Sequence, residues 1–145
     1  MKNPGVGCAI MLIKDDKVLL GHRSDNPETA DTLLHGEGTW TMPGGKMDFQ
    51  ERPKDCARRE ALEETGIEVG GVELVSVSND RVHDAHFVTL GFMSRDFNCE
   101  PKVMEPDEIT EWRWFSFDEI PKNLFFPTRK IVENYRDQNI LHEDD

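Results

Sequence analysis

The chain has 145 residues, of which 37% are hydrophobic and 32% are charged, so its length and balance suit one domain with a packed core. The formal net charge of −12 argues against nucleic-acid binding, because neutralising backbone phosphates requires a basic face. The same charge would be repelled by an anionic membrane surface.

The first third of the chain predicts a β-hairpin followed by a long loop. Residues 6–13, which are mostly apolar, and residues 18–23, which begin with three apolar side chains, flank a short polar turn, so we expect two antiparallel strands. Residues 24–38 are polar and include two glycines and a proline, which is typical of a lid or a binding loop. A short strand at 39–42 then leads into the glycine pair at 44–45.

A helix is predicted at residues 53–65. Pro53 suits the first turn, and Asp55 lies near the positive end of the helix dipole. The residues that follow are mostly strong helix formers. Gly66 suits the left-handed position that ends many helices, so we expect the helix to stop just before it.

The second half of the chain predicts further strands and one more helix. The expected elements are a strand at 72–77, a polar turn at 79–84, a strand at 86–93, a loop at 99–109, a strand at 111–115, a helical turn at 117–121 and an amphipathic helix at 128–138. Trp112 and Trp114 fall on one face of their strand, so we expect both to pack in the core or in a dimer interface. Neither repeats nor linkers divide the chain, and the mixture of elements indicates an α+β or mixed class.

Nothing in the sequence predicts a membrane span or an exported protein. The longest apolar stretch, residues 8–13, falls well short of the roughly 18–20 residues that cross a bilayer. The first residues lack a signal-peptide pattern. The three cysteines, Cys8, Cys56 and Cys99, have no paired spacing, so we expect free thiols in a reducing cytoplasm.

An acidic cluster is predicted on one face of the helix at 53–65. Glu60 is three residues from Glu63 and four from Glu64, and these separations bring side chains together on a helix. Repelling carboxylates are tolerated where divalent cations bind, and oxygen ligands favour Mg²⁺ or Mn²⁺. Bound cations would also allow an anionic ligand to bind an acidic protein. The apolar residues expected to pack against the rest of the domain are Ala57, Ala61 and Leu62.

Other residues around the helix fit this cluster at specific offsets. Arg59 can hold a carboxylate by a forked hydrogen bond, and Glu51 can fold back from the preceding loop. Gly44 and Gly45 lack side chains, so their backbone could approach a phosphate or give a carbonyl to a metal. A glutamate-rich helix face is usually a solvated surface, but solvation requires neither Arg59 nor the glycines. Cys56 is expected to be a packing residue rather than a nucleophile.

The segment GKMDFQERPKDCARREALEETGI at 45–67 resembles the Nudix box, whose pattern is G-x5-E-x7-R-E-U-x-E-E-x-G-U, with U an apolar residue. Its fixed positions are occupied by Gly45, Glu51, Arg59, Glu60, Glu63, Glu64 and Gly66, and its U positions by Ala61 and Ile67. The resemblance implies a Nudix-type α/β/α sandwich with a mixed β-sheet, as one domain at 1–145. Residues 142–145 are expected to form a disordered tail.

The resemblance also implies roles for individual residues in metal-assisted hydrolysis at phosphorus. The catalytic residues would be Glu60, Glu63, Arg59 and Glu51, and the Mg²⁺ ligands would be Gly44, Glu60, Glu63 and Glu64. A further acid from a later loop usually completes the metal set in this family. Glu105, Glu108 and Glu111 are the candidates, and the sequence does not choose among them.

The segments outside the box indicate a substrate class. The start of the chain resembles the MutT-like branch, and residues 100–127 are similar to eukaryotic MutT-homologue triphosphatases that act on oxidised or thiolated purine nucleotides. Proline is absent where the ADP-ribose branch carries one, and no SQPWPFPxS-like string follows the box. We therefore expect hydrolysis of a nucleoside triphosphate to monophosphate and pyrophosphate. The open alternatives are another nucleoside diphosphate derivative (ADP-ribose, a nucleotide sugar or a dinucleotide) and a non-catalytic nucleotide sensor.

The sequence also offers candidate residues for binding the nucleoside part of the substrate. Leu124, Phe125 and Phe126 occupy the place where the eukaryotic relatives line a purine pocket, although the three could equally be core. Arg23 could meet phosphate at the end of its strand, and Gly45 could approach the substrate through its backbone. A homodimer is expected by resemblance alone.

Overall fold

The computed structural model describes residues 3–28 and 33–142, and all statements on the fold concern these residues. The elements are β1 (Gly5–Lys14), β2 (Lys17–Arg23), β3 (Trp40–Thr41), β4 (Gly44–Lys46), α1 (Pro53–Thr65), β5 (Glu73–Val82), β6 (Ala85–Ser94), β7 (Ile109–Ser116) and α2 (Phe126–Asp137).

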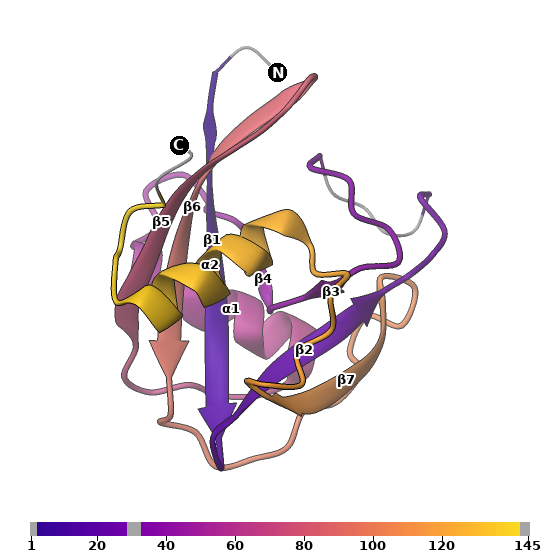
Figure 1. The fold of residues 1–145 in the computed structure, drawn as a ribbon, viewed down its shortest axis with the longest axis vertical. Helices are drawn as coiled ribbons and strands as arrows, with labels where there is room; N and C mark the ends of the chain where they lie inside the picture. The colour runs from indigo at the N-terminus through magenta and orange to yellow at the C-terminus, as the bar shows by residue number, and fades with distance from the viewer. Residues whose placement is uncertain (1–2, 29–32, 143–145) are drawn as a thin grey trace.

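The strands form one mixed sheet in which β1 is central. The order is β3-β2-β1-β6-β5, with β4 pairing with β1 and β7 with β2. The β1–β6 pair is parallel and places Gly7 opposite Thr89, whereas the other pairs of named strands are antiparallel. Figure 1 shows α1 and α2 on opposite faces of this sheet. The predicted α/β/α sandwich with a mixed sheet is therefore confirmed, as one domain.

Two apolar layers hold the helices to the sheet. Side chains alternate between the faces of a strand, so Cys8, Ile10 and Leu12 of β1 pack with α1, and Met11 and Ile13 pack with α2. The α1 residues in the first layer are Cys56, Ala57 and Ala61, and the α2 residues in the second layer are Ile131 and Val132. Small residues on α1 allow the helix to lie close to the sheet.

Helix α1 has the predicted bounds. Pro53 begins it, and Gly66 ends it in the left-handed conformation, with a φ of 75°. The prediction that Leu62 packs inward was wrong, because this side chain is 46% exposed. The stripe that faces the sheet includes Glu60 instead, and its members are Cys56, Ala57, Glu60, Ala61 and Thr65.

The β5–β6 hairpin is longer than the sequence predicted. Residues 79–82 belong to β5, and the turn is limited to residues 83–84. Asp80 is polar yet fully buried, because the Lys130 ammonium of α2 lies 3.1 Å from its carboxylate. Lys130 also donates a hydrogen bond to the Asn79 carbonyl. A polar segment can thus continue a strand when a distant helix supplies its partners.

Two smaller predictions need correction. The expected helical turn at 117–121 is a turn in which the Glu119 amide donates to the Ser116 carbonyl. The expected tail at 142–145 begins too early, since His142 is held: its amide donates to the Val77 carbonyl, and its Nε2 lies 2.8 Å from the Glu133 carboxylate. Residues 143–145 lie outside the described residues.

Neither described helix has the length and apolar character required to cross a membrane.

Candidate active site

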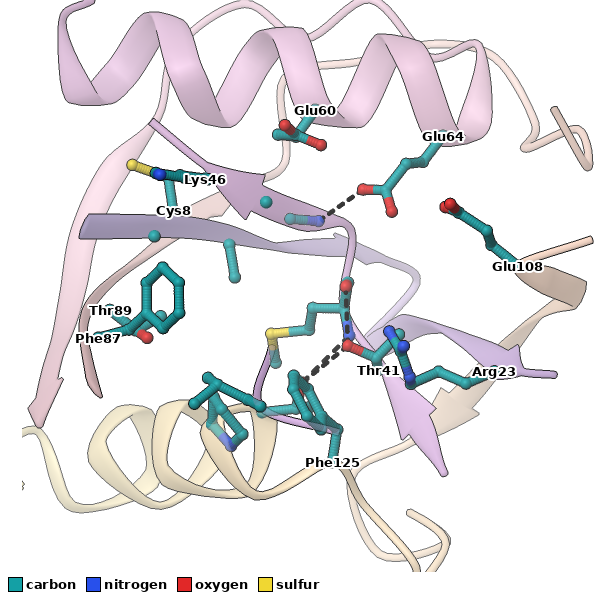
Figure 2. Close-up of a pocket in the computed structure, with 18 of the residues that line it drawn as sticks. Cys8, Arg23, Thr41, Lys46, Glu60, Glu64, Phe87, Thr89, Glu108 and Phe125 are labelled. Carbon is teal, nitrogen blue, oxygen red and sulfur yellow. Dashed lines mark hydrogen bonds between the residues drawn. The ribbon is translucent and has the colours of Figure 1, made fainter. Parts of the chain in front are cut away.

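A cavity of about 410 Å³ opens between the sheet, α1 and the start of α2. Figure 2 shows Glu60 and Glu64 extending from α1 on one side and Phe125 lying on the other. The acidic residues that line this cavity are Glu60, Glu63, Glu64, Glu105 and Glu108. Its apolar lining includes Leu33, Leu34, Met42, Phe87, Phe125 and Pro127. One cavity therefore joins a charged end to an apolar, aromatic end.

Arg59 organises the charged end through several hydrogen bonds. Its Nε and Nη2 donate to the two carboxylate oxygens of Glu51, at 2.7 and 3.0 Å, in the predicted fork. Its Nη1 donates to Glu60 at 2.9 Å and to Glu63 at 3.2 Å. The bond from Arg59 is the largest cause that lowers the pKa of Glu51 to about 2. Arg59 thus fixes the loop before α1 to the helix.

Glu64 and Glu60 lie in a crowded, partly desolvated environment. The Gly44 amide donates to the Glu64 carboxylate at 2.6 Å. Burial raises the pKa of Glu64 well above its ordinary value, and the charge of Glu60 raises it further. Burial also raises the pKa of Glu60, although Arg59 opposes the shift. These shifts mean that the protein alone stabilises the charged carboxylates poorly.

Glu105 joins this group from the loop before β7. Its pKa is raised by burial first, and then by the charges of Glu108 and Glu63. Both loop acids line the cavity, whereas Glu111 is an exposed partner of Arg113 at 2.9 Å. Of the three acids that the sequence left open, the geometry therefore favours Glu105 and Glu108.

The donor set fits a hard divalent cation in its chemistry. Carboxylate oxygens and nearby backbone carbonyls are the ligands that Mg²⁺ prefers. Gly45 leaves the necessary room, since a Cβ there would lie 2.5 Å from the Glu60 carboxylate. Within residues 3–28 and 33–142, however, no three His, Cys, Asp or Glu side chains already converge on one point. Glu60 and Glu63 are bonded to Arg59, and Glu64 is bonded to the Gly44 amide, so binding a metal would require small side-chain shifts.

The predicted nucleoside residues are only partly brought together. Phe125 lines the cavity, and the Arg23 guanidinium lies over its ring, 5.2 Å from the centroid. Leu124 packs instead in the layer under α2, and Phe126 packs beside Leu34. Leu124 forms a bridge with Trp40 and Phe126 begins α2, so the three neighbours point in different directions. Leu124 and Phe126 therefore lie outside the described lining of the cavity, in line with the alternative that they are core residues.

Several cavity residues were not identified from the sequence. Lys46 follows the glycine pair directly, and its place beside the box could have indicated it. Phe87 and Thr89 are two residues apart on β6 and share one face, but apolar alternation does not mark a face as a cavity wall. Leu34 comes from the long loop, where no periodicity exists.

The three cysteines are free thiols, as predicted. Cys56 lies on the face of α1 that packs against the sheet, where the neighbouring Cys8 and burial both raise its pKa. A high pKa disfavours the thiolate, which is the nucleophilic form. The expectation that Cys56 is a packing residue therefore agrees with its surroundings.

Comparisons with known proteins give a consistent family. The model of the NUDIX domain matches residues 1–135. A "MutT-like protein" of Streptomyces ambofaciens is 29% identical over 79% of this chain and 65% of its own length, so the chain spans slightly under two thirds of that relative. An "ADP-ribose pyrophosphatase" of Methanocaldococcus jannaschii is 30% identical over 92% of this chain and 73% of its own. A crystal structure of a MutT NUDIX hydrolase from Burkholderia pseudomallei superposes with a TM-score of 0.81 and 32% identity, covering 92% of this chain and 98% of that one.

Proposed function

The chain belongs to the NUDIX family of pyrophosphohydrolases, and we propose that it hydrolyses a nucleoside triphosphate to the monophosphate and pyrophosphate with Mg²⁺. The observation that carries this proposal is the single cavity that joins the acidic cluster to an aromatic end. Its volume of about 410 Å³ lies within the range of roughly 300–1,000 Å³ that is typical of small-molecule sites.

The two ends of the cavity suit the two parts of a nucleotide. A base can stack on Phe125, and the apolar side chains of Leu34 and Phe87 would exclude water around it. Lys46 and Arg23 are the basic residues of the described cavity lining, and they can contact phosphate oxygens. Because the acidic residues outnumber these two cations, phosphates would bind at the charged end only together with divalent cations.

Glu60, Glu63, Glu64 and the Gly44 carbonyl are the residues that would hold Mg²⁺, with Glu105 or Glu108 as the further acid. When bound, the metal would neutralise phosphate charge and make the attacking water more acidic. Arg59 holds Glu60 and Glu63 in position, and Glu51 in turn orients Arg59. Glu60 or Glu105 would accept the proton from the water as it attacks phosphorus. The phosphoanhydride bond then breaks, and pyrophosphate leaves from the nucleoside monophosphate.

A second substrate class is supported by one of the relatives. The Methanocaldococcus jannaschii protein is named an ADP-ribose pyrophosphatase. ADP-ribose would place its adenosine at the aromatic end and its diphosphate at the acidic end, as a triphosphate would. The cavity geometry alone does not separate these two substrates, so their relative turnover decides between them.

The test is product release with Mg²⁺ across nucleoside triphosphates, 8-oxo-dGTP, ADP-ribose, nucleotide sugars and dinucleoside polyphosphates. The proposal expects pyrophosphate and a monophosphate from at least one triphosphate, at a higher kcat/KM than for ADP-ribose. Faster turnover of ADP-ribose or a nucleotide sugar would overturn the substrate assignment and leave the metal site unchanged.

We also propose a cytoplasmic location and a homodimer. The free thiols of Cys8, Cys56 and Cys99 support a reducing compartment. The homodimer rests on family resemblance, and light scattering of the purified protein checks it by giving the mass of one chain or of two.

A further inference from the structure

Thr89 stands out among the residues that line the cavity. It lies in the middle of β6 and is only 6% exposed, yet it forms part of the cavity wall next to Phe87 (Figure 2). Throughout residues 3–28 and 33–142, no hydrogen-bond partner is found for its side-chain hydroxyl. Its hydroxyl oxygen is not among the fully buried unpaired atoms of these residues, so it is open to the cavity, where water can pair with it. A ligand that covers this hydroxyl would displace its water, and it would lose affinity unless it offered a hydrogen-bond partner in return.

The structure keeps open the space in front of this hydroxyl. Gly7 of β1 lies directly opposite Thr89 in the parallel β1–β6 pair. A Cβ at residue 7 would lie 3.8 Å from the Thr89 hydroxyl oxygen and 3.7 Å from the Gly45 carbonyl oxygen. With glycine at this position, that space belongs to the cavity, whose lining includes both Gly7 and Gly45.

Thr89 lies on the cavity wall between residues of the acidic end and residues of the aromatic end. On one side, Gly7 and Gly45 connect it to the acidic end, where Gly45 lies against the Glu60 carboxylate. On the other side, Phe87 occupies the same face of β6 and belongs to the aromatic end. A ligand that spans the cavity would place its nucleoside, rather than its phosphates, against Thr89.

We propose that the Thr89 hydroxyl hydrogen-bonds the nucleoside part of the substrate and helps to determine which nucleoside is accepted. This inference rests on the proposed function, because it takes the substrate to be a nucleotide. The group contacted is a sugar hydroxyl or a polar atom on the edge of the base, since a threonine hydroxyl can donate to or accept from either.

The test compares Thr89→Val with Thr89→Ser. Valine keeps the shape of threonine without the hydroxyl, whereas serine keeps the hydroxyl. Each variant is assayed on triphosphates that share one base and carry ribose, 2′-deoxyribose or 2′,3′-dideoxyribose, and on triphosphates that share one sugar and differ in base. The Val variant should lose roughly 3- to 10-fold in kcat/KM, mainly through KM, on nucleotides that carry the contacted group. The Ser variant should stay within about 2-fold of the unmodified protein.

The pattern of losses identifies the contact. A loss that disappears when a sugar hydroxyl is removed assigns the contact to that hydroxyl, and a loss that changes with the base assigns it to the base edge. Either pattern supports the inference. Equal losses on every nucleotide would indicate a purely structural effect and overturn it, as would unchanged kinetics.

Gly7→Ala provides an independent test from the opposite strand. Its methyl group would reach the hydroxyl and the Gly45 carbonyl at ordinary contact distances, so the fold should accept it. It should weaken the same nucleotides that Thr89→Val weakens, and selective weakening of other nucleotides would contradict the inference.

Failure of the proposed function gives a different result. If the unmodified protein hydrolyses no triphosphate but hydrolyses another nucleotide, the proposed substrate is wrong, and the same variant ratios on that nucleotide decide the role of Thr89. Absence of turnover with every nucleotide overturns both.

Discussion

A single guanidinium group, that of Arg59, connects three carboxylates from two segments of the chain by hydrogen bonds. It bonds Glu51 in the loop before α1 and both Glu60 and Glu63 on the helix. The fork to Glu51 requires a planar group with parallel donors, and a lysine ammonium cannot reproduce it. The position of the acidic cluster therefore depends on the shape of this side chain as well as on its charge.

Arg59→Lys should lower kcat by roughly 10- to 100-fold, because small displacements of groups that support a metal site have effects of this size. The matched control is Arg58→Lys. Arg58 bonds the Gly70 carbonyl and Asp55 outside the cavity, so its replacement should leave kcat within about 2-fold. Steady-state kinetics with saturating Mg²⁺ compares the two, and equal losses would show that the fork has no special role.

Glu51 should make stability depend on pH in acid. Its pKa is lowered from the ordinary value of 4.5 to about 2, so the folded state prefers the charged form more than the unfolded state does. Its contribution is fully present above pH 4.5 and is lost as the pH falls towards 2. Glu51→Gln should therefore be less stable than the unmodified protein at pH 7. Urea unfolding should show this difference shrinking between pH 4.5 and 2, and a constant difference would contradict the assignment.

At the scale of elements, the approach of β4 to α1 depends on a missing side chain. A Cβ at Gly45 would lie 2.5 Å from the Glu60 carboxylate. The obstacle is the end of a flexible side chain, so the helix can stay in place while Glu60 moves away. The close packing of β4 against α1 thus holds the Glu60 carboxylate at the wall of the cavity.

Gly45→Ala should therefore fold but lose activity, by at least about 10-fold in kcat, since a misplacement near 1 Å can cost about 100-fold. Gly71→Ala is the matched control, because a Cβ there would meet only the Asp96 carboxylate at an ordinary 3.7 Å. Circular dichroism establishes folding, and kinetics measures the loss. Full activity in the Gly45 variant would show that Glu60 need not hold this position.

The sequence predicted the elements whose ends are set by nearby residues such as proline and glycine. It missed the features that depend on partners far away in the chain. Pro53 and Gly66 mark the ends of α1, and the spacing of the glutamates placed Glu60 and Glu64 together. Strand β5 was cut short, because the buried Asp80 is explained only by Lys130 of α2. The sequence could not identify Thr89 as a cavity residue, because a threonine within a strand gives no indication of a ligand. Its position became clear only from the pairing of β6 with β1.

At the scale of the whole molecule, the net charge of −12 includes carboxylates that the protein does not neutralise. Burial and neighbouring acids raise the pKa values of Glu60, Glu64 and Glu105, so their charges destabilise the folded chain. A divalent cation at this place would remove part of that penalty. Binding to the folded state alone raises stability by mass action.

Mg²⁺ at about 100 times its Kd should stabilise the protein by about 2.7 kcal/mol and raise Tm by several degrees. A chelator should remove both the gain in Tm and the activity. Replacing Glu63 and Glu64 together by Gln should preserve the fold, abolish turnover and remove the Mg²⁺ gain.

The matched control replaces Glu68 and Glu73 by Gln, which changes the net charge equally at exposed sites. This variant should keep the full gain in Tm. Equal gains in both double variants, measured by differential scanning calorimetry, would place the metal elsewhere.

The parallel pairing of β1 with β6 also bears on how the chain folds. It joins Gly7 to Thr89 across the centre of the sheet, with α1 between them in sequence. Contacts between such distant parts of a chain close large loops and form slowly, whereas a helix can form from local contacts alone. During refolding, α1 can therefore form, with its glutamates aligned on one face, before the sheet is complete and the cavity exists. Catalytic activity should therefore recover more slowly than the circular dichroism signal of the helices. Activity would then report when the native sheet has formed.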